Sequence, residues 1–298
     1  MGIDEVALNF SPGSIALLNL ILAVIMFAVA IDLKPADFQR LRRAPLPLMI
    51  GLASQFLLLP ALTFLLVLAT APPPSIALGL ILVAACPGGN ISNYITHRAG
   101  GNAALSVSMT AVGTVGAILL TPLNLAFWGG LYPPTQAILR ATMVDPQTVA
   151  VTVGLVLILP LVLGITLNDR RPDLSSRLRR PVQGLAFAIF LAFVLLTLVG
   201  NWQTFRLYAG SVAALVLLHN ALALGGGYGF AALTGQSVPD RRAIAIETGI
   251  QNSGLGLALI FAFFGGLGGM AVVAAFWGLW HAVSGLVLAA LLRRHAIV

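Results

Sequence analysis

The sequence contains few charged residues and a single cysteine. Only 8% of its 298 residues are charged, whereas 59% are hydrophobic. A chain of this length with that ratio cannot cover itself with a water-soluble surface. The lone cysteine, Cys86, excludes an intrachain disulfide and supplies no cysteine metal cluster, so a small buried thiol is the simplest interpretation. The surroundings of this chain are therefore predicted to be lipid.

About nine apolar windows are long enough to cross a bilayer as helices, since each crossing needs roughly 20 residues. The expected spans cover 14–33, 47–70, 76–96, 103–128, 149–168, 183–199, 208–233, 243–264 and 270–292. Short polar or Pro/Gly-rich turns separate them, and one longer loop is expected at 129–146. The predicted fold is an all-α polytopic membrane protein, one transmembrane unit over 1–298 without a separate soluble domain.

Basic residues gather on one side of this predicted topology. All of the 16 Lys and Arg residues except Arg140 and Arg206 follow odd-numbered spans, and basic loops are retained in the cytoplasm. The N-terminus is therefore expected outside the cell membrane and the C-terminus in the cytoplasm. The net charge of +7 comes from basic residues that are spread over these turns. In this interpretation these residues contact lipid headgroups, so the charge indicates no nucleic-acid partner.

Glu247 is the one acidic residue expected at membrane depth. The other eight of the nine acidic residues lie in tails, loops or span ends. An ionised carboxylate inside the membrane costs about 2.5–3.5 kcal/mol by insertion scales, which indicates a functional partner for it. Polar side chains at 251–253 follow it and are flanked by Gly249 and Gly254, so a helix broken at membrane depth is predicted here.

A second interruption occurs in the third span, at Cys86-Pro-Gly-Gly-Asn-Ile-Ser-Asn93. Proline removes a backbone donor and the two glycines loosen the chain. The two interrupted spans are five apart and so run in opposite directions, which suggests an inverted repeat. Paired interruptions of this kind indicate the midplane site of a secondary transporter, where unwound carbonyls bind cations and half-helix N-termini attract anions.

The segments Cys86-Pro-Gly-Gly-Asn-Ile-Ser-Asn93, Glu247-Thr-Gly-Ile-Gln-Asn252 and Leu33-Lys-Pro-Ala-Asp-Phe38 resemble the bile acid:sodium symporter family. The resemblance extends over nearly the whole chain and includes Gly51-Leu-Ala-Ser-Gln55 and Ala104-Leu-Ser-Val-Ser-Met-Thr110. It implies two broken helices that cross in a core domain, formed by spans near 47–128 and 208–292. A smaller panel domain, near 14–33 and 149–199, would move against this core, in the manner of the family's nine-span members.

The resemblance also implies two sodium sites. Matching positions for the first are Ser92, Asn93, Ser106, Thr110 and Glu247. Matching positions for the second are Gln55, Glu247, Thr248, Ile250 and Gln251, where Thr248 and Ile250 would contribute backbone carbonyls. All five side chains of the first set carry oxygen, as do those of Gln55, Glu247 and Gln251 in the second, and hard cations prefer oxygen ligands.

The predicted function is symport of sodium and an organic anion, either bile acid-like or a small carboxylate, by alternating access. Candidate substrate-binding residues are Asn90, Asn252 and His281. No organic cofactor and no obligatory protein partner are indicated. A carrier that uses a proton on Glu247 instead of sodium is the nearest alternative. An intramembrane enzyme is disfavoured because no defensible catalytic set is present, and a passive channel is a third alternative.

Overall fold

The computed structural model describes residues 3–4, 23–24, 27–28, 30–31, 45–89, 91–142, 146–200 and 202–294, and helices make up most of this part of the chain. The helices are α3 (Pro45–Ala53), η1 (Ser54–Leu58), α4 (Leu59–Thr70), α5 (Pro74–Ala85), α6 (Ile91–Arg98), α7 (Ala103–Leu131), α8 (Pro133–Ala141), α9 (Pro146–Arg170), α10 (Pro172–Gly200), α11 (Trp202–Leu233), α12 (Val238–Gly249), α13 (Ser253–Phe263) and α14 (Gly268–Arg294).

Several of these helices have the length and composition of membrane spans. By length and apolar composition, four described segments can cross a membrane: Pro45–Thr70, Ala103–Leu131, Val212–Leu233 and Gly268–Arg293. The predicted all-α polytopic membrane fold is confirmed. The first expected span, 14–33, falls largely outside the described residues, so the count of about nine crossings stays a prediction.

Large apolar side chains lie on both the inside and the outside of the bundle. Helix α5 is buried along nearly its whole length, and α13 is buried almost as completely, as expected of helices that are apolar on every side. The outward faces of α4, α7 and α14 expose Leu65, Leu123 and Val287. Exposed leucines and valines on long helices suit a hydrocarbon solvent.

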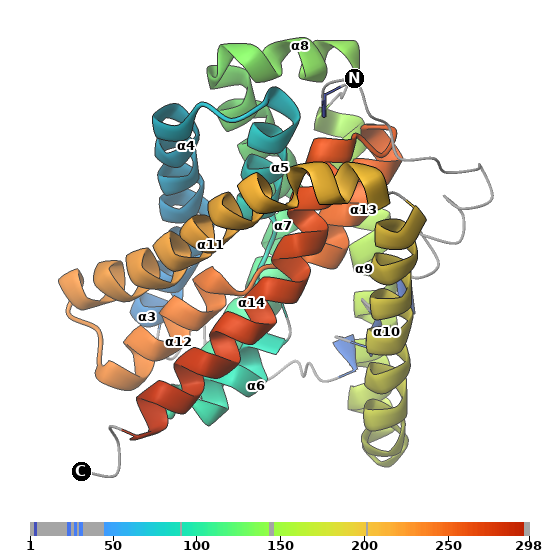
Figure 1. Ribbon diagram of the computed structural model, residues 1–298. Helices are drawn as coiled ribbons and strands as arrows, with labels where there is room; N and C mark the ends of the chain where they lie inside the picture. Colours follow the sequence, from blue (N-terminus) through green and yellow to red (C-terminus); the bar gives the residue numbers. More distant parts are fainter. Residues whose placement is uncertain are drawn as a thin grey trace.

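The two interrupted spans form the centre of the molecule. In Figure 1, α5 lies above α6 while α13 lies above α12, so the two broken helices run in opposite directions. Both breaks occur where the sequence predicted them: α5 ends at Ala85 and α6 begins at Ile91, whereas α12 ends at Gly249 and α13 begins at Ser253. The unwound segments meet in an isolated antiparallel bridge between Gly88 and Gln251.

The expected loop at 129–146 was wrong in part, because it contains helix α8. The Thr135 hydroxyl has its one hydrogen within reach of the carbonyls of Gly129 and Tyr132, and Gln136 Nε2 donates to the carbonyl of Gly130, at 2.8 Å. These bonds satisfy carbonyls at the end of α7. The start of α10 also differs from the expected span at 183–199, since this helix begins at Pro172 and includes Arg177 and Arg180.

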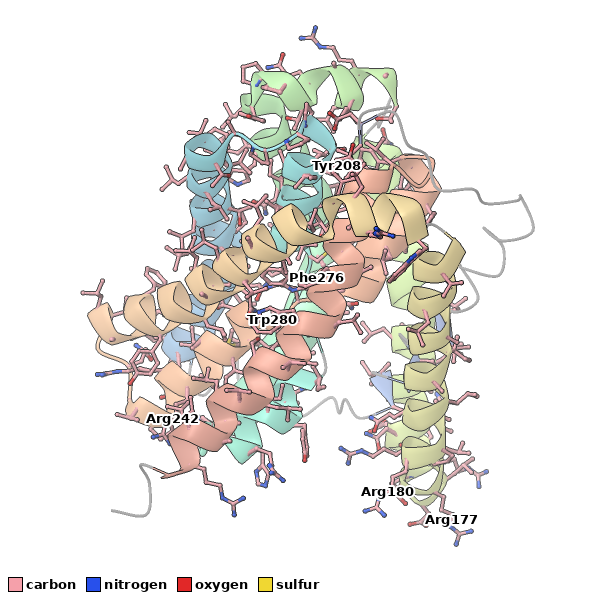
Figure 2. All side chains as sticks on the ribbon, in the orientation of Figure 1. Arg177, Arg180, Tyr208, Arg242, Phe276 and Trp280 are labelled. Atoms are coloured by element: carbon pink, nitrogen blue, oxygen red, sulfur yellow. The ribbon has the colours of Figure 1, made fainter. Side chains whose placement is uncertain are left out.

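The two ends of the helical bundle differ in their residues. Arg177, Arg180 and Arg242 lie at the same end of the molecule (Figure 2), and α14 finishes at that end. At the opposite end, Asp4 Oδ1 accepts a hydrogen bond of 2.8 Å from the Ser75 backbone N–H in the first turn of α5. Ile3 is buried beside it in the main apolar core. Ile3 and Asp4 are thus held against the first broken helix and the core around it.

Candidate functional site

The carboxylate of Glu247 lies in the last turn of α12 and is fully buried. Its Oε2 accepts hydrogen bonds from the hydroxyls of Ser92, at 2.5 Å, and Ser106, at 2.8 Å. Its Oε1 accepts one from the hydroxyl of Thr110, at 2.6 Å. Three separate helices, α6, α7 and α12, therefore supply side chains to a single point.

The oxygen lone pairs around Glu247 outnumber the hydroxyl hydrogens that point to them. The Asn93 Oδ1 oxygen accepts from the same two hydroxyls, Ser106 at 2.8 Å and Thr110 at 3.2 Å. Each hydroxyl carries one hydrogen and can serve only one of these acceptors at a time. Three hydroxyl hydrogens therefore serve three acceptor oxygens, Glu247 Oε1, Glu247 Oε2 and Asn93 Oδ1, and the lone pairs that remain on these oxygens and on the hydroxyls are the ligands that a hard cation prefers. We call Ser92, Asn93, Ser106, Thr110 and Glu247 the carboxylate cluster.

Helical periodicity explains how α7 contributes twice. Ser106 and Thr110 are four residues apart and so share one face. Thr114, a further four residues along, donates instead to the Thr110 carbonyl, at 2.7 Å, and Ser108 donates to the Ala104 carbonyl. Those two hydroxyls bond within their own helix, as Ser and Thr in membrane helices commonly do.

A second group of polar atoms lies beside the crossover. Gln55 Nε2 donates to the Cys86 carbonyl at 3.0 Å and to Gln251 Oε1 at 2.8 Å, so this side chain joins both interrupted helices. Gln251 Nε2 donates to the Thr248 carbonyl at 2.6 Å. The Ile250 carbonyl accepts the Gly89 N–H at 2.7 Å. Three of the residues expected in the second sodium site are thus bonded in one chain, Gln55 to Gln251 to Thr248.

Two glycines allow the interrupted segments to approach this closely. A Cβ atom at Gly88 would lie 2.4 Å from Glu247 Oε1, and one at Gly89 would lie 2.8 Å from the Gln251 carbonyl oxygen. The Asn252 N–H donates to the Pro87 carbonyl at 2.9 Å, which closes the pairing on the other side. Residues with side chains at 88 and 89 would separate the segments.

The candidate substrate residues are less fully defined. Asn90 lies outside the described residues. Asn252 Oδ1 accepts the Leu255 N–H at 3.0 Å and so caps α13. His281 is buried on α14, and one turn later a Cβ at Gly285 would meet Ile250 of the crossover at 2.8 Å. His281 therefore lies on the helix that packs against the crossover, one turn from the contact.

Two supporting residues were not among the predicted site residues. Ser54 lies 2.9 Å from Thr248, hydroxyl to hydroxyl, and Asn220 Nδ2 donates to the Gly249 carbonyl at 2.8 Å. Both are fully buried. Their polarity within apolar spans was the available signal, but sequence spacing alone does not show which helix such a side chain meets.

Two interrupted apolar helices that meet through unwound segments, with polar side chains gathered around them, define the architecture of a secondary transporter. The sequence model of the sodium bile acid symporter family matches residues 19–206. An uncharacterized sodium-dependent transporter of Bacillus subtilis is 32% identical over 91% of this chain and 81% of its own length. This chain belongs to the sodium bile acid symporter family, whose members are transporters and not enzymes.

Relatives with narrower names extend this comparison. A probable chloroplastic sodium/metabolite cotransporter of Arabidopsis thaliana is 34% identical over 92% of this chain and 66% of its own length. A sodium-dependent organic anion transporter of Mus musculus is 29% identical over 90% of this chain and 70% of its own length. The plant relative is therefore about half as long again as the part that this chain matches.

Proposed function

We propose that this protein imports an organic anion together with sodium by alternating access. The observation that carries the proposal is the carboxylate cluster, in which oxygens from three helices converge on one buried negative charge. Glu247 also lies at the C-terminal end of α12, where the helix dipole disfavours a negative charge and favours a cation. A sodium ion would balance both the carboxylate and the dipole, and it would be coordinated by the oxygen lone pairs that the three hydroxyl hydrogens leave free.

The second sodium ion is proposed to bind at the crossover, at Gln55, Glu247, Gln251 and the carbonyls of Thr248 and Ile250. Support comes from Gln55 Oε1, a buried oxygen without a hydrogen-bond partner in the described part of the chain. A buried acceptor without a donor is costly, and a cation removes that cost. Sodium would then hold the two interrupted helices in one arrangement.

The organic anion is proposed to bind beside this crossover, near Asn90, Asn252 and His281. Sodium and anion are coupled if both favour the same conformation, because a ligand with equal affinity for two states shifts neither. Each should then raise the affinity for the other by the same factor. A screen of bile acid-like and small carboxylate anions in the presence of sodium would identify the substrate.

Contacts between helices support a division into core and panel. Ser175 Oγ donates to the Ile31 carbonyl at 3.0 Å, and Gln183 Nε2 donates to the Ala28 carbonyl at 3.3 Å, so polar bonds join α10 to both of these residues. The contact of this panel with α7 includes an apolar cluster of Ala30, Ala111 and Leu161. We propose that the panel moves against the core across this apolar contact, because no polar bond within that cluster must break.

Sodium-specific stabilisation tests the proposal. We expect the thermal midpoint of the detergent-purified protein to rise with sodium, and not with potassium or choline at the same ionic strength and pH, because ligand that binds only the folded state stabilises it. Glu247→Ala should lose this rise. If sodium has no effect but lowering the pH stabilises the wild type and not the variant, the proton-coupled alternative replaces sodium symport.

Orientation in the cell membrane is proposed from the basic end of the molecule in Figure 2, since basic termini of membrane helices stay in the cytoplasm. Cys86 is the only cysteine and is buried, so an added terminal cysteine would be the accessible thiol. A membrane-impermeant maleimide added to intact cells should label Gly2→Cys, and label Val298→Cys only after permeabilisation. The reverse pattern would invert the proposed orientation.

A further inference from the structure

The helix that carries Gln55 changes its hydrogen-bond register next to the crossover. From Pro45 to Thr70 the helix is continuous, but residues Ser54–Leu58 form a π-helical turn. The Leu59 N–H donates to the Ser54 carbonyl, five residues back, instead of four. The flanking residues Ala53 and Leu59 keep ordinary α-helical dihedral angles. One extra residue is thus inserted into an otherwise regular helix, a feature often found at functional sites.

Pro60 supplies a local cause for this turn. In an α-helical register, the N–H of residue 60 would donate to the Phe56 carbonyl, but proline has no N–H and its ring collides with the carbonyl four residues back. A wider turn immediately before Pro60 would relieve that collision. The sequence from Ser54 to Pro60 contains no glycine, so Pro60 is the one residue of this stretch that disfavours a regular helix on its own.

The wider turn directs two consecutive side chains to the crossover. Neighbouring residues on an α-helix point in directions about 100° apart and do not share a face. Here Ser54 contacts Thr248, while Gln55 contacts the Cys86 carbonyl and Gln251. Both side chains are fully buried. Without the inserted residue, one half of the helix would be rotated about its axis by roughly 100° relative to the other half, which is the rotation per residue of an α-helix. Gln55 would then point away from the crossover.

The orientation of the Gln55 amide follows from the same contacts. Its Nε2 lies within hydrogen-bond distance of two acceptors, the Cys86 carbonyl and Gln251 Oε1. Both amide hydrogens are therefore used, and Oε1 is left buried without a donor in the described part of the chain. An acceptor oxygen held in this way is suited to a cation.

We propose that Pro60 is a positioning residue: it fixes the π-turn, which directs Gln55 Oε1 into the crossover and so sets the sodium affinity of the second site. This inference rests on the proposed sodium symport. Pro60 itself need not touch the ion. Pro60 acts through the hydrogen-bond register of Ser54–Leu58. The ligand whose affinity changes is the sodium ion of the second site.

The test compares sodium titrations of Pro60→Ala and a matched control. Alanine supplies the missing N–H and permits the regular register, so the sodium concentration for half-maximal thermal stabilisation should rise about tenfold, equivalent to the loss of one good interaction. The midpoint without sodium should stay the same or rise, because a proline leaves the helix interior. Pro160→Ala, at a buried proline inside α9, should keep the sodium dependence of the wild type.

A second variant and a double-mutant cycle separate positioning from general damage. Deletion of Leu57, an exposed residue of the π-turn, together with Pro60→Ala removes the inserted residue and should weaken sodium binding further. In a Gln55→Ala background, Pro60→Ala should have no added effect on sodium affinity, because the group through which it acts is gone.

The outcomes distinguish this inference from the proposed function. If the wild type shows no sodium-specific stabilisation, sodium symport itself is wrong. If the wild type responds to sodium and Pro60→Ala responds at the same concentrations, the positioning role is overturned. Equal weakening by Pro60→Ala with and without Gln55 would also overturn it, because the effect would then not pass through Gln55. If the deletion variant does not fold, Pro60→Ala and the cycle still decide.

Discussion

Glu247→Gln is expected to abolish sodium-driven uptake of the organic anion into proteoliposomes and to weaken sodium binding at least 100-fold. The substitution keeps the shape of the side chain but removes the one formal charge from the carboxylate cluster. Opposite unit charges 4 Å apart attract by about 4 kcal/mol at an effective dielectric constant near 20. That energy corresponds to about a thousandfold in affinity, so the hydroxyl and amide oxygens that remain cannot compensate. Uptake under an imposed sodium gradient, with a sodium titration of thermal stability, measures both effects.

The thermal midpoint of Glu247→Gln without sodium distinguishes loss of the cation site from general destabilisation. A neutral amide is less costly to bury than an ionised carboxylate, so Glu247→Gln should unfold at the same temperature as the wild type or higher when sodium is absent. Asp173→Asn, at an exposed carboxylate in the first turn of α10, removes the same charge outside the cluster and should leave sodium binding unchanged. A Glu247→Gln variant that still binds sodium with wild-type affinity would contradict the assignment of the cation site.

Gly88→Ala is expected to destabilise the protein and to displace the Glu247 carboxylate. The added methyl group would lie 2.4 Å from Glu247 Oε1 and 2.9 Å from its carboxyl carbon, and that carboxylate is held by three hydrogen bonds. Overpacking in a filled core costs about 1–3 kcal/mol. We expect a lower thermal midpoint without sodium and a sodium affinity reduced about tenfold or more, measured by the same titration.

Gly225→Ala is the matched control, because it lies within α11 and a Cβ there would meet nothing within 4 Å. Replacing a glycine inside a helix by alanine stabilises by about 0.5–1 kcal/mol when space allows. The control should therefore unfold at the wild-type temperature or slightly above it. Equal effects of both substitutions would show that the close approach at Gly88 has no special role.

Local chemistry made the centre of the molecule predictable. Pro87, Gly88 and Gly89 break one helix, and Gly249 with the polar residues after it breaks the other, so both interruptions follow from neighbouring residues. The approach of Ser106 and Thr110 to Glu247 was harder to predict from the sequence. Their four-residue spacing predicts a shared helix face, but only the family resemblance connected that face with α12.

Features that depend on packing or on competing local effects were missed. Helix α8 begins with two prolines and lies in a polar stretch, so its sequence resembles a loop. The π-turn was missed because a window average treats Pro60 as one apolar residue among many. Asn220 is polar within an apolar span, and its carbonyl partner at Gly249 is set by how α11 packs against α12. The number of crossings and the residues of the sodium sites stay predictions.

The pairing of the two interrupted segments also constrains how the protein is made. The Gly89 N–H and the Pro87 carbonyl obtain their partners from Ile250 and Asn252, which leave the ribosome much later. Backbone polar groups inside a bilayer cannot rely on water in the meantime. The first broken helix therefore requires temporary shelter during biosynthesis, from the insertion machinery or from a shallower position at the membrane surface, until the second broken helix has been synthesised.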